Sequence, residues 1–397
     1  MASTRARYDY QQLRSYCDTQ RQHEALDALE GRSVQEAATH LGTSVRKLYE
    51  LLERLKKKAA AAGYSPEHDL NHPVAPGFIA KGHSTLYRDG QPVLQWVKTK
   101  QDDEAREQLL RAFAVELADG VKGAAKPIPT LKSGQDASLL SAYVVGDAHL
   151  GMYAWKDETG AEDFDTSIGC NDLRGAFRHL TASSPRSRVG MLVNVGDFLH
   201  ANDTTSQTPS SKHALDTDGR FSQVVDRAVA VFRDAVHMML QRHQEVWIVN
   251  ARGNHDPDAA MFLNKILEAY YHREPRVRVL PNVGKFVYVE WGQVLIGVHH
   301  GDRVKRQQLY EAMTRDKRES WGRARHAYFW TGHIHHKSAE EIGGCLFESF
   351  NTLAPPDAWH AAQGYGANRE MQQITLHREH GIVGRNVCGL EMARLAA

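Results

Sequence analysis

The hydrophobic pattern of the chain changes near residue 139. Six short apolar runs follow this point, and helical stretches separate most of them. The runs are 139–146, 188–196, 245–253, 285–290, 293–301 and 327–332. Apolar runs of this length, most of them ending in glycine and a polar residue, predict buried strands whose carboxyl ends carry functional groups. Because helical stretches lie between them, we expect an α/β fold for this region.

The first 120 residues instead predict a mainly helical region. Ser33 is placed to cap a helix over 34–41, and Gly42 follows as a helix breaker. A second, longer helix is expected over 45–62, where apolar side chains recur at steps of three and four residues. Two helices joined by a glycine-containing turn are typical of a helix-turn-helix.

A β-hairpin and another helix are expected to complete the N-terminal region. The hairpin is predicted at 83–99 around the Asp89-Gly90 turn, and the helix at 102–119. The stretch that follows is rich in glycine, proline, lysine and serine, a composition that indicates a linker. We therefore expect an N-terminal region at 1–120, a linker at 121–138 and the main domain at 139–397.

The amino-acid composition excludes only a few classes of protein. A hydrophobic content of 42% and a net charge of +1 are ordinary for a globular protein, and they give no overall attraction to nucleic acid or membranes. The four cysteines form no CxxC pair, which fits a reducing compartment and argues against a cysteine zinc site. No apolar stretch predicts a signal peptide or a membrane span, so we expect a cytoplasmic protein without membrane contact.

Polar motifs end five of the apolar runs in a fixed order. They are Gly146-Asp147-Ala148-His149, Gly196-Asp197, Gly253-Asn254-His255-Asp256, His299-His300-Gly301-Asp302 and Gly332-His333-Ile334-His335. Aspartate, asparagine and histidine donors without thiolates suit Mn²⁺, Fe or Zn²⁺ better than Ca²⁺. One such motif occurs easily by chance, but five in order at predicted strand ends indicate a metal centre.

The same motifs indicate a reaction. Two neighbouring cations can clamp a phosphate and lower the pKa of a bridging water, and Asp197 is a suitable bridging carboxylate. We therefore expect in-line attack of a metal-bridging hydroxide on a phosphoester. His255, next to Asn254, is expected to protonate the leaving oxygen or to stabilise developing charge. His200 is expected on the same side, and Asp256 is expected to support the turn.

The motifs GDAHLG, GDFLH, GNHD, HHGD and GHIHH resemble those of the calcineurin-like metallophosphoesterase superfamily, over about residues 140–375. The resemblance implies a β-sandwich flanked by helices, with two divalent metal ions at the strand ends and Mn²⁺ as the favoured ion. The first ion would be bound by Asp147, His149, His335 and the bridging Asp197. The second would be bound by Asp197, Asn254, His333 and either His300 or His299, with His300 slightly favoured.

Within the superfamily, GDFLH followed by a polar loop resembles the SbcD-like repair nucleases. This resemblance implies that His200 joins His255 near the scissile phosphate. The chain departs from those nucleases because it lacks their long coiled-coil-binding C-terminus and adds an N-terminal region. Its layout is similar to that of phosphoesterases from bacteriophages and prophages, which favours DNA as a partner.

The predicted helix at 45–62 offers a possible DNA contact. Six lysines and arginines lie between residues 44 and 58, and Arg46, Lys47 and Arg54 are our candidates for phosphate contacts. The alternative is a helix–helix seam in a homo-oligomer, since an apolar stripe runs along the same helix. The residues of that stripe are Val45, Leu48, Leu52 and Leu55.

Two further segments are candidates for substrate contacts. The polar loop at 201–220 is expected either as free surface or as a border of the substrate groove. Trp359 and Tyr365 lie in a loop near the C-terminus, where they would either stack on bases or pack against the sheet.

The leading interpretation is a metal-dependent phosphodiesterase that acts as a DNA exo- or endonuclease. One alternative is a small-molecule phosphodiesterase or phosphatase whose N-terminal region serves assembly. Another is a DNA-binding regulatory protein in which the metal site is secondary.

Overall fold

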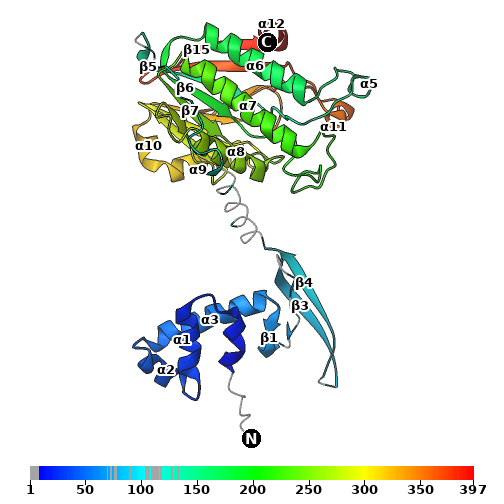
Figure 1. Ribbon diagram of the computed structural model, residues 1–397, viewed down its shortest axis with the longest axis vertical. Helices are drawn as coiled ribbons and strands as arrows, with labels where there is room; N and C mark the ends of the chain where they lie inside the picture. Colours follow the sequence, from blue (N-terminus) through cyan, green and yellow to red (C-terminus); the bar gives the residue numbers. More distant parts are fainter. Residues whose placement is uncertain are drawn as a thin grey trace. The chain divides into compact units, whose positions relative to one another are not determined.

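The computed structural model describes residues 9–397, with gaps. The gaps are positions 69, 72–73, 76–77, 90, 103–107, 109–115, 117–118, 127, 130 and 132–133. The chain divides into two compact units, Met1–Leu110 and Arg111–Ala397, here called unit 1 and unit 2 (Figure 1). Most of the helix predicted at 102–119 lies outside the described residues.

Unit 1 begins with short helices. They are the 3₁₀ helix η1 (Tyr10–Tyr16), α1 (Gln20–Leu29), α2 (Val34–His40) and α3 (Val45–Ala61). Ser33 and Glu36 form a capping box at the start of α2, and the Ser44 side chain accepts a hydrogen bond from the backbone of Lys47 at the start of α3. The two helices of the predicted helix-turn-helix are therefore present, and Ser33 caps the first of them as expected.

The apolar stripe of α3 is buried inside unit 1. Leu48, Leu52 and Leu55 are 2%, 0% and 1% exposed, and they share a core with Leu13 and Leu26. Helical periodicity alone did not distinguish a core-facing stripe from a seam between two chains. Because the leucines are already buried within one chain, the stripe does not offer such a seam.

The predicted hairpin is longer than expected. Its strands are β3 (Phe78–Arg88) and β4 (Gln91–Gln101), which pair antiparallel with Arg88 opposite Gln91. A second, very short pair consists of β1 (Tyr64–Ser65) and β2 (Leu70–Asn71), with the 3₁₀ helix η2 (Pro66–His68) between them.

Unit 2 is built on two sheets. The first contains β5 (Asp136–Val145), β6 (Ser187–Asn194), β7 (Glu245–Asn250), β8 (Val277–Val279), β14 (Glu370–His377) and β15 (Gly381–Gly389), in the order β15-β14-β5-β6-β7-β8. The second contains β9 (Val287–Trp291), β10 (Val294–Val298), β11 (His326–Thr331), β12 (Ser338–Ile342) and β13 (Cys345–Ser349), in the order β12-β13-β11-β10-β9. All six apolar runs predicted as strands form strands.

Helices cover the outer faces of both sheets (Figure 1). The first sheet carries α6 (Thr166–Ser183), α7 (Phe221–Leu240), α8 (Pro257–Tyr270) and α12 (Leu390–Ala396). The second carries α9 (Arg306–Asp316) and α10 (Arg318–Arg323). Between the sheets, Val144 and Val193 of the first meet Ile296 and Trp330 of the second in a buried core. The predicted fold class, a β-sandwich flanked by helices, is confirmed.

The stretch at 121–138, predicted as a linker, belongs to unit 2, and part of it contacts the end of α8. The backbone N–H groups of Gly123 and Ala125 donate hydrogen bonds to carbonyl groups at the end of α8, and β5 already begins at Asp136. Among the described residues, the helices lack the length and hydropathy that crossing a membrane requires.

Candidate metal centre

All five sequence motifs begin within three residues of the end of a strand. Strands β5, β6 and β7 are parallel neighbours in the first sheet, and β10 and β11 are parallel neighbours in the second. The carboxyl ends of parallel strands lie at the same edge of a sheet, where α/β folds usually place their ligands. The topology therefore brings residues distant in sequence to one end of the sandwich.

The first ligand cluster consists of Asp147, His149 and His335. One donor atom from each lies within 4.8 Å of the other two. The Nε2 atom of His335 lies 3.1 Å from Nε2 of His149 and 3.5 Å from Oδ1 of Asp147. Two imidazole nitrogens and a carboxylate oxygen converging in this way suit a transition-metal ion. The structure thus brings together three of the four ligands expected for the first ion.

The second cluster consists of Asp197, His300 and His333, again with donor atoms within 4.8 Å of one another. Nε2 of His300 lies 2.9 Å from Oδ2 of Asp197 and 3.0 Å from Oδ1 of Asn254. The amide oxygen of Asn254 therefore joins this cluster. The two clusters adjoin, because the backbone N–H of His149 donates to the carbonyl oxygen of Asp197 at 3.0 Å.

His300, and not the alternative His299, faces the clusters. The Nδ1–H of His300 donates to the carbonyl oxygen of Val195 at 3.1 Å, which leaves Nε2 as the ligand atom. His299 lies outside the cluster, with its Nδ1 accepting from the backbone N–H of Gly301 and its ring centroid 4.7 Å from that of Phe286. Successive side chains of an extended segment point to opposite sides, so only one of the two can face the site.

Backbone groups of neighbouring motifs hold both carboxylates. The N–H of His333 donates to Asp147 at 2.9 Å and 3.1 Å, and the N–H of His255 donates to Oδ1 of Asp197 at 2.8 Å. Burial opposes ionisation of Asp197, but the neighbouring His300 and His255 outweigh it and lower its pKa well below the usual value. Buried charges are normally paired or bound to metals, so these donors fit divalent cations.

Five of the predicted ligands have a left-handed backbone conformation. Their φ angles are 29° for Asp147, 45° for His149, 52° for Asp197, 71° for His333 and 53° for His335. Such angles are uncommon outside glycine, and each costs on the order of 1–3 kcal/mol unless the surroundings enforce it. Their concentration at the strand ends indicates a functional site.

Gly253 lies too close to Asp197 to carry a side chain, since an added Cβ would be 1.9 Å from Oδ1 of Asp197. We expect Gly253→Ala to displace this carboxylate and to weaken metal binding by roughly 10–100-fold, the range found when a ligand loses its support. Metal content after dialysis against Mn²⁺ measures the effect. Gly284→Ala is the matched control, because a Cβ there meets nothing within 4 Å. Equal metal content in both variants would contradict the role given to this close approach.

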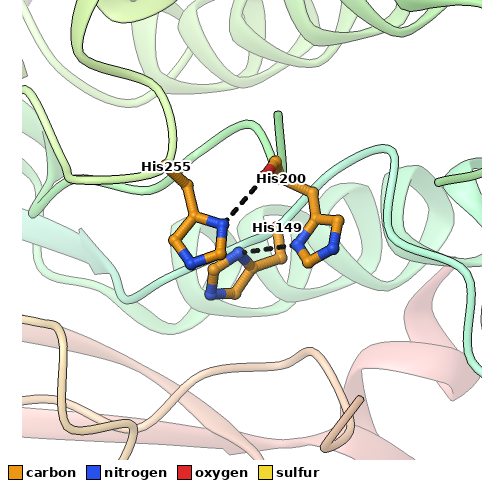
Figure 2. A group of neighbouring side chains, drawn as sticks. All are labelled: His149, His200 and His255. Carbon is orange, nitrogen blue, oxygen red and sulfur yellow. Dashed lines mark hydrogen bonds between the residues drawn. The ribbon is translucent and has the colours of Figure 1, made fainter. Parts of the chain in front are cut away.

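His255 lies beside the clusters (Figure 2). Its Nδ1–H donates to the backbone carbonyl oxygen of His200 at 2.9 Å, so Nε2 is the nitrogen left for a substrate. The side chain is half-buried, whereas His200 is only 1% exposed. Together with His149, the two imidazoles also form a third group of possible ligands. The contact of His255 with a phosphate stays a prediction.

His200 lies beside His149, and their Nδ1 atoms are 3.3 Å apart (Figure 2). Burial lowers the pKa of His200 to about 3, so its ring is neutral at pH 7. A neutral His200 is able to accept a hydrogen bond from Nδ1–H of His149, an arrangement that leaves Nε2 of His149 for a metal. The position of His200 therefore favours a role in orienting His149, rather than the predicted contact with the phosphate.

Asp256 supports the turn, as expected. It is fully buried, and its two oxygens accept hydrogen bonds from the backbone N–H groups of Gly253 at 3.1 Å and Leu199 at 3.0 Å. Burial and the nearby charge of Asp197 raise its pKa to about 7. These bonds tie the turn that carries Asn254 and His255 to the end of the preceding motif.

Sequence reasoning missed His360. This residue belongs to the short helix α11 (Ala358–Ala362), and its ring stacks on that of His335 with centroids 4.8 Å apart. Its Nδ1–H donates to Oδ1 of Asp357 at 2.7 Å. Burial would raise the pKa of Asp357, but His360 lowers it to about 2, so the carboxylate stays ionised. The signal in the sequence was only an Asp-x-x-His spacing.

Comparison with solved structures finds proteins named as phosphoesterases. One is a predicted phosphoesterase from Streptococcus pneumoniae (12% identity, 64% of this chain and 99% of the other, TM-score 0.27). Another is an archaeal phosphodiesterase (12%, 63% and 99%, 0.32), and a third is YfcE, a phosphoesterase from E. coli (13%, 62% and 98%, 0.29). No family model and no curated protein matches the chain. At this level of similarity, the functional conclusion depends on the site itself.

Proposed function

We propose that the protein is a dinuclear-metal phosphoesterase that hydrolyses phosphodiester bonds. The observation that carries this proposal is the pair of adjoining clusters, each with three donors within 4.8 Å of one another. One ion would be held by Asp147, His149 and His335, and the other by His300, His333 and Asn254, with Asp197 as the bridge. Nitrogen and oxygen donors without thiolate favour Mn²⁺, with Fe or Zn²⁺ as alternatives.

When bound, two such ions would neutralise phosphate charge and lower the pKa of an attacking water. The chain's own residues supply the remaining functions. Because Nδ1–H of His255 is bonded to the carbonyl oxygen of His200, the proton for the leaving oxygen would come from Nε2, which carries one when the ring is an imidazolium. His200 orients His149, and Asp256 holds the turn that carries Asn254 and His255.

DNA is the proposed substrate. Arg46, Lys47 and Arg54 are exposed on α3, the second helix of the helix-turn-helix. Arg46 also forms an ion pair with Glu50 at 3.0 Å on the exposed face of α3, whereas Lys56 pairs with Glu67 at 2.9 Å and is less exposed. Exposed cations on such a helix are suited to contact phosphates of the DNA backbone.

The test compares substrates on the full-length chain loaded with Mn²⁺ or Zn²⁺. We expect hydrolysis of bis-p-nitrophenyl phosphate and of labelled single- or double-stranded DNA, with EDTA abolishing both. Replacing Arg46, Lys47 and Arg54 together by glutamine should weaken DNA cleavage and reduce its salt dependence, while the small diester is hydrolysed as before. Cleavage of p-nitrophenyl phosphate without cleavage of either diester would instead support a phosphatase.

A further inference from the structure

A pocket opens directly beside the ligand clusters. Its volume is about 330 Å³, and His333 and His335 form part of its lining. This size lies at the lower end of the range for small-ligand pockets, roughly 300–1,000 Å³. A phosphoester bound at the clusters would therefore place one of its substituents at the pocket's mouth.

The outer wall of the pocket is aromatic. Trp359 and Tyr365 have nearly parallel rings with centroids 6.0 Å apart, and they are 55% and 59% exposed. The ring of His360 lies 5.0 Å from that of Trp359 and 4.8 Å from that of His335. A row of rings thus leads from a metal-ligand residue to the surface. The exposure of Trp359 and Tyr365 argues against the expectation that they pack on the sheet.

The polar loop at 201–220 reaches the same row of rings. The ring of His213 in this loop lies 6.5 Å from that of Trp359. The loop therefore lies beside the pocket, which agrees with the expectation that it borders the substrate groove.

Hydrogen bonds hold the wall in place. Asp357 accepts from the backbone N–H of His360 at 2.8 Å and from its ring at 2.7 Å, which fixes the start of α11. After Tyr365, at the C-terminal end of the wall segment, Arg369 donates to the carbonyl oxygen of Leu353 at 2.6 Å and forms an ion pair with Glu162. A wall held at both ends loses little conformational entropy when a ligand binds.

The pocket offers little charge to a ligand. Arg369 belongs to the lining, but its guanidinium is paired with Glu162 and Asp172. The lining also contains four histidines and Thr352, and most of its other residues are apolar, such as Pro355, or carry an amide, such as Asn368. A cationic side chain would find no carboxylate among these lining residues, and their one guanidinium is already paired. A flat, uncharged ring fits better, and the amide of Asn368 offers its polar edge both a donor and an acceptor.

We propose that this pocket binds the nucleobase adjacent to the scissile phosphate. The inference rests on the proposed phosphodiesterase function, and it specifies the substrate as a diester that carries at least one nucleoside. Bases stack on aromatic side chains largely irrespective of their identity, because every base has a π-face. The pocket therefore contributes affinity for nucleotides without selecting a sequence.

The test uses two diesters with the same leaving group, thymidine 5′-p-nitrophenyl phosphate and methyl p-nitrophenyl phosphate. Trp359→Ala is expected to raise KM for the thymidine diester about tenfold, a loss within the range for one stacked base. The kcat should change little, because stacking is made equally in the ground and transition states. KM for the methyl diester should stay as in the wild type, since it carries no base.

Three further variants sharpen the result. Trp359→Phe keeps a ring and should remain close to wild type, while Tyr365→Ala should raise KM for the thymidine diester. Trp155 is 52% exposed and lies outside the pocket lining, so Trp155→Ala should change neither KM. If Trp359→Ala shifts both KM values alike, or shifts neither, the inference is wrong.

A binding measurement separates this inference from the proposed function. If the wild type hydrolyses neither diester, the phosphodiesterase proposal fails, and equilibrium dialysis with Mn²⁺ then decides about the pocket. If thymidine 5′-monophosphate binds more tightly than inorganic phosphate, and Trp359→Ala removes this difference, the result would support base binding in the pocket even without the phosphodiesterase activity. Equal binding of the two would overturn it.

Discussion

Replacing Asp197 by asparagine is expected to lower phosphodiester hydrolysis by at least about 10³-fold, because the proposed bridge between two cations, which would stabilise the reaction by several kcal/mol, would be lost. Oδ2 of Asp197 lies 2.9 Å from His300, and Oδ1 accepts from the backbone of His255 at 2.8 Å. An amide of the same shape removes the negative charge and replaces one carboxylate oxygen, an acceptor, by an NH₂ group, a donor. The rate with bis-p-nitrophenyl phosphate and the bound Mn²⁺ should both fall.

Asp226→Asn is the matched control, because its carboxylate is exposed on α7 and distant in sequence from every motif. It should retain wild-type rate and metal content. If Asp197→Asn kept the biological function of the protein while losing its metal, the third interpretation would gain support. The protein would then be a DNA-binding regulator with a secondary metal site.

The strands were predictable where their residues are locally distinctive. All six apolar runs form strands; each is short, most are largely buried, and most end in glycine and a polar residue. β12 was not predicted, since its residues Ser338–Ile342 are mainly exposed and polar. The order of strands within the sheets could not be predicted from the sequence either, because it depends on pairing between segments distant in sequence.

The residues of the two clusters were predictable for a similar reason, but the positions of the remaining histidines were not. A residue of the two clusters can be identified directly from its motif. The position of His200 beside His149, in contrast, depends on how two strand ends meet. The choice between His299 and His300 depends on which side of the extended chain faces the site. His360 reaches His335 through folding of a loop, which motif spacing does not report.

Replacing His255 by alanine is expected to lower kcat for DNA by about 10²–10⁴-fold, the usual contribution of a general acid. The loss should be smaller for bis-p-nitrophenyl phosphate, because p-nitrophenolate is stable enough to leave without a proton. Metal content should stay at the wild-type level, since the two clusters are complete without this side chain. The rates for both substrates and the bound Mn²⁺ are measured on the same preparation.

The exposed His272 supplies the control, and His272→Ala should match the wild type in all three measurements. The ratio of the two rate losses is the informative quantity. A general acid produces a larger loss with DNA than with the activated diester, because only the alkoxide leaving group depends on protonation. An equal loss with both substrates, accompanied by lost Mn²⁺, would instead place His255 among the metal ligands with His149 and His200, the third group that the structure brings together.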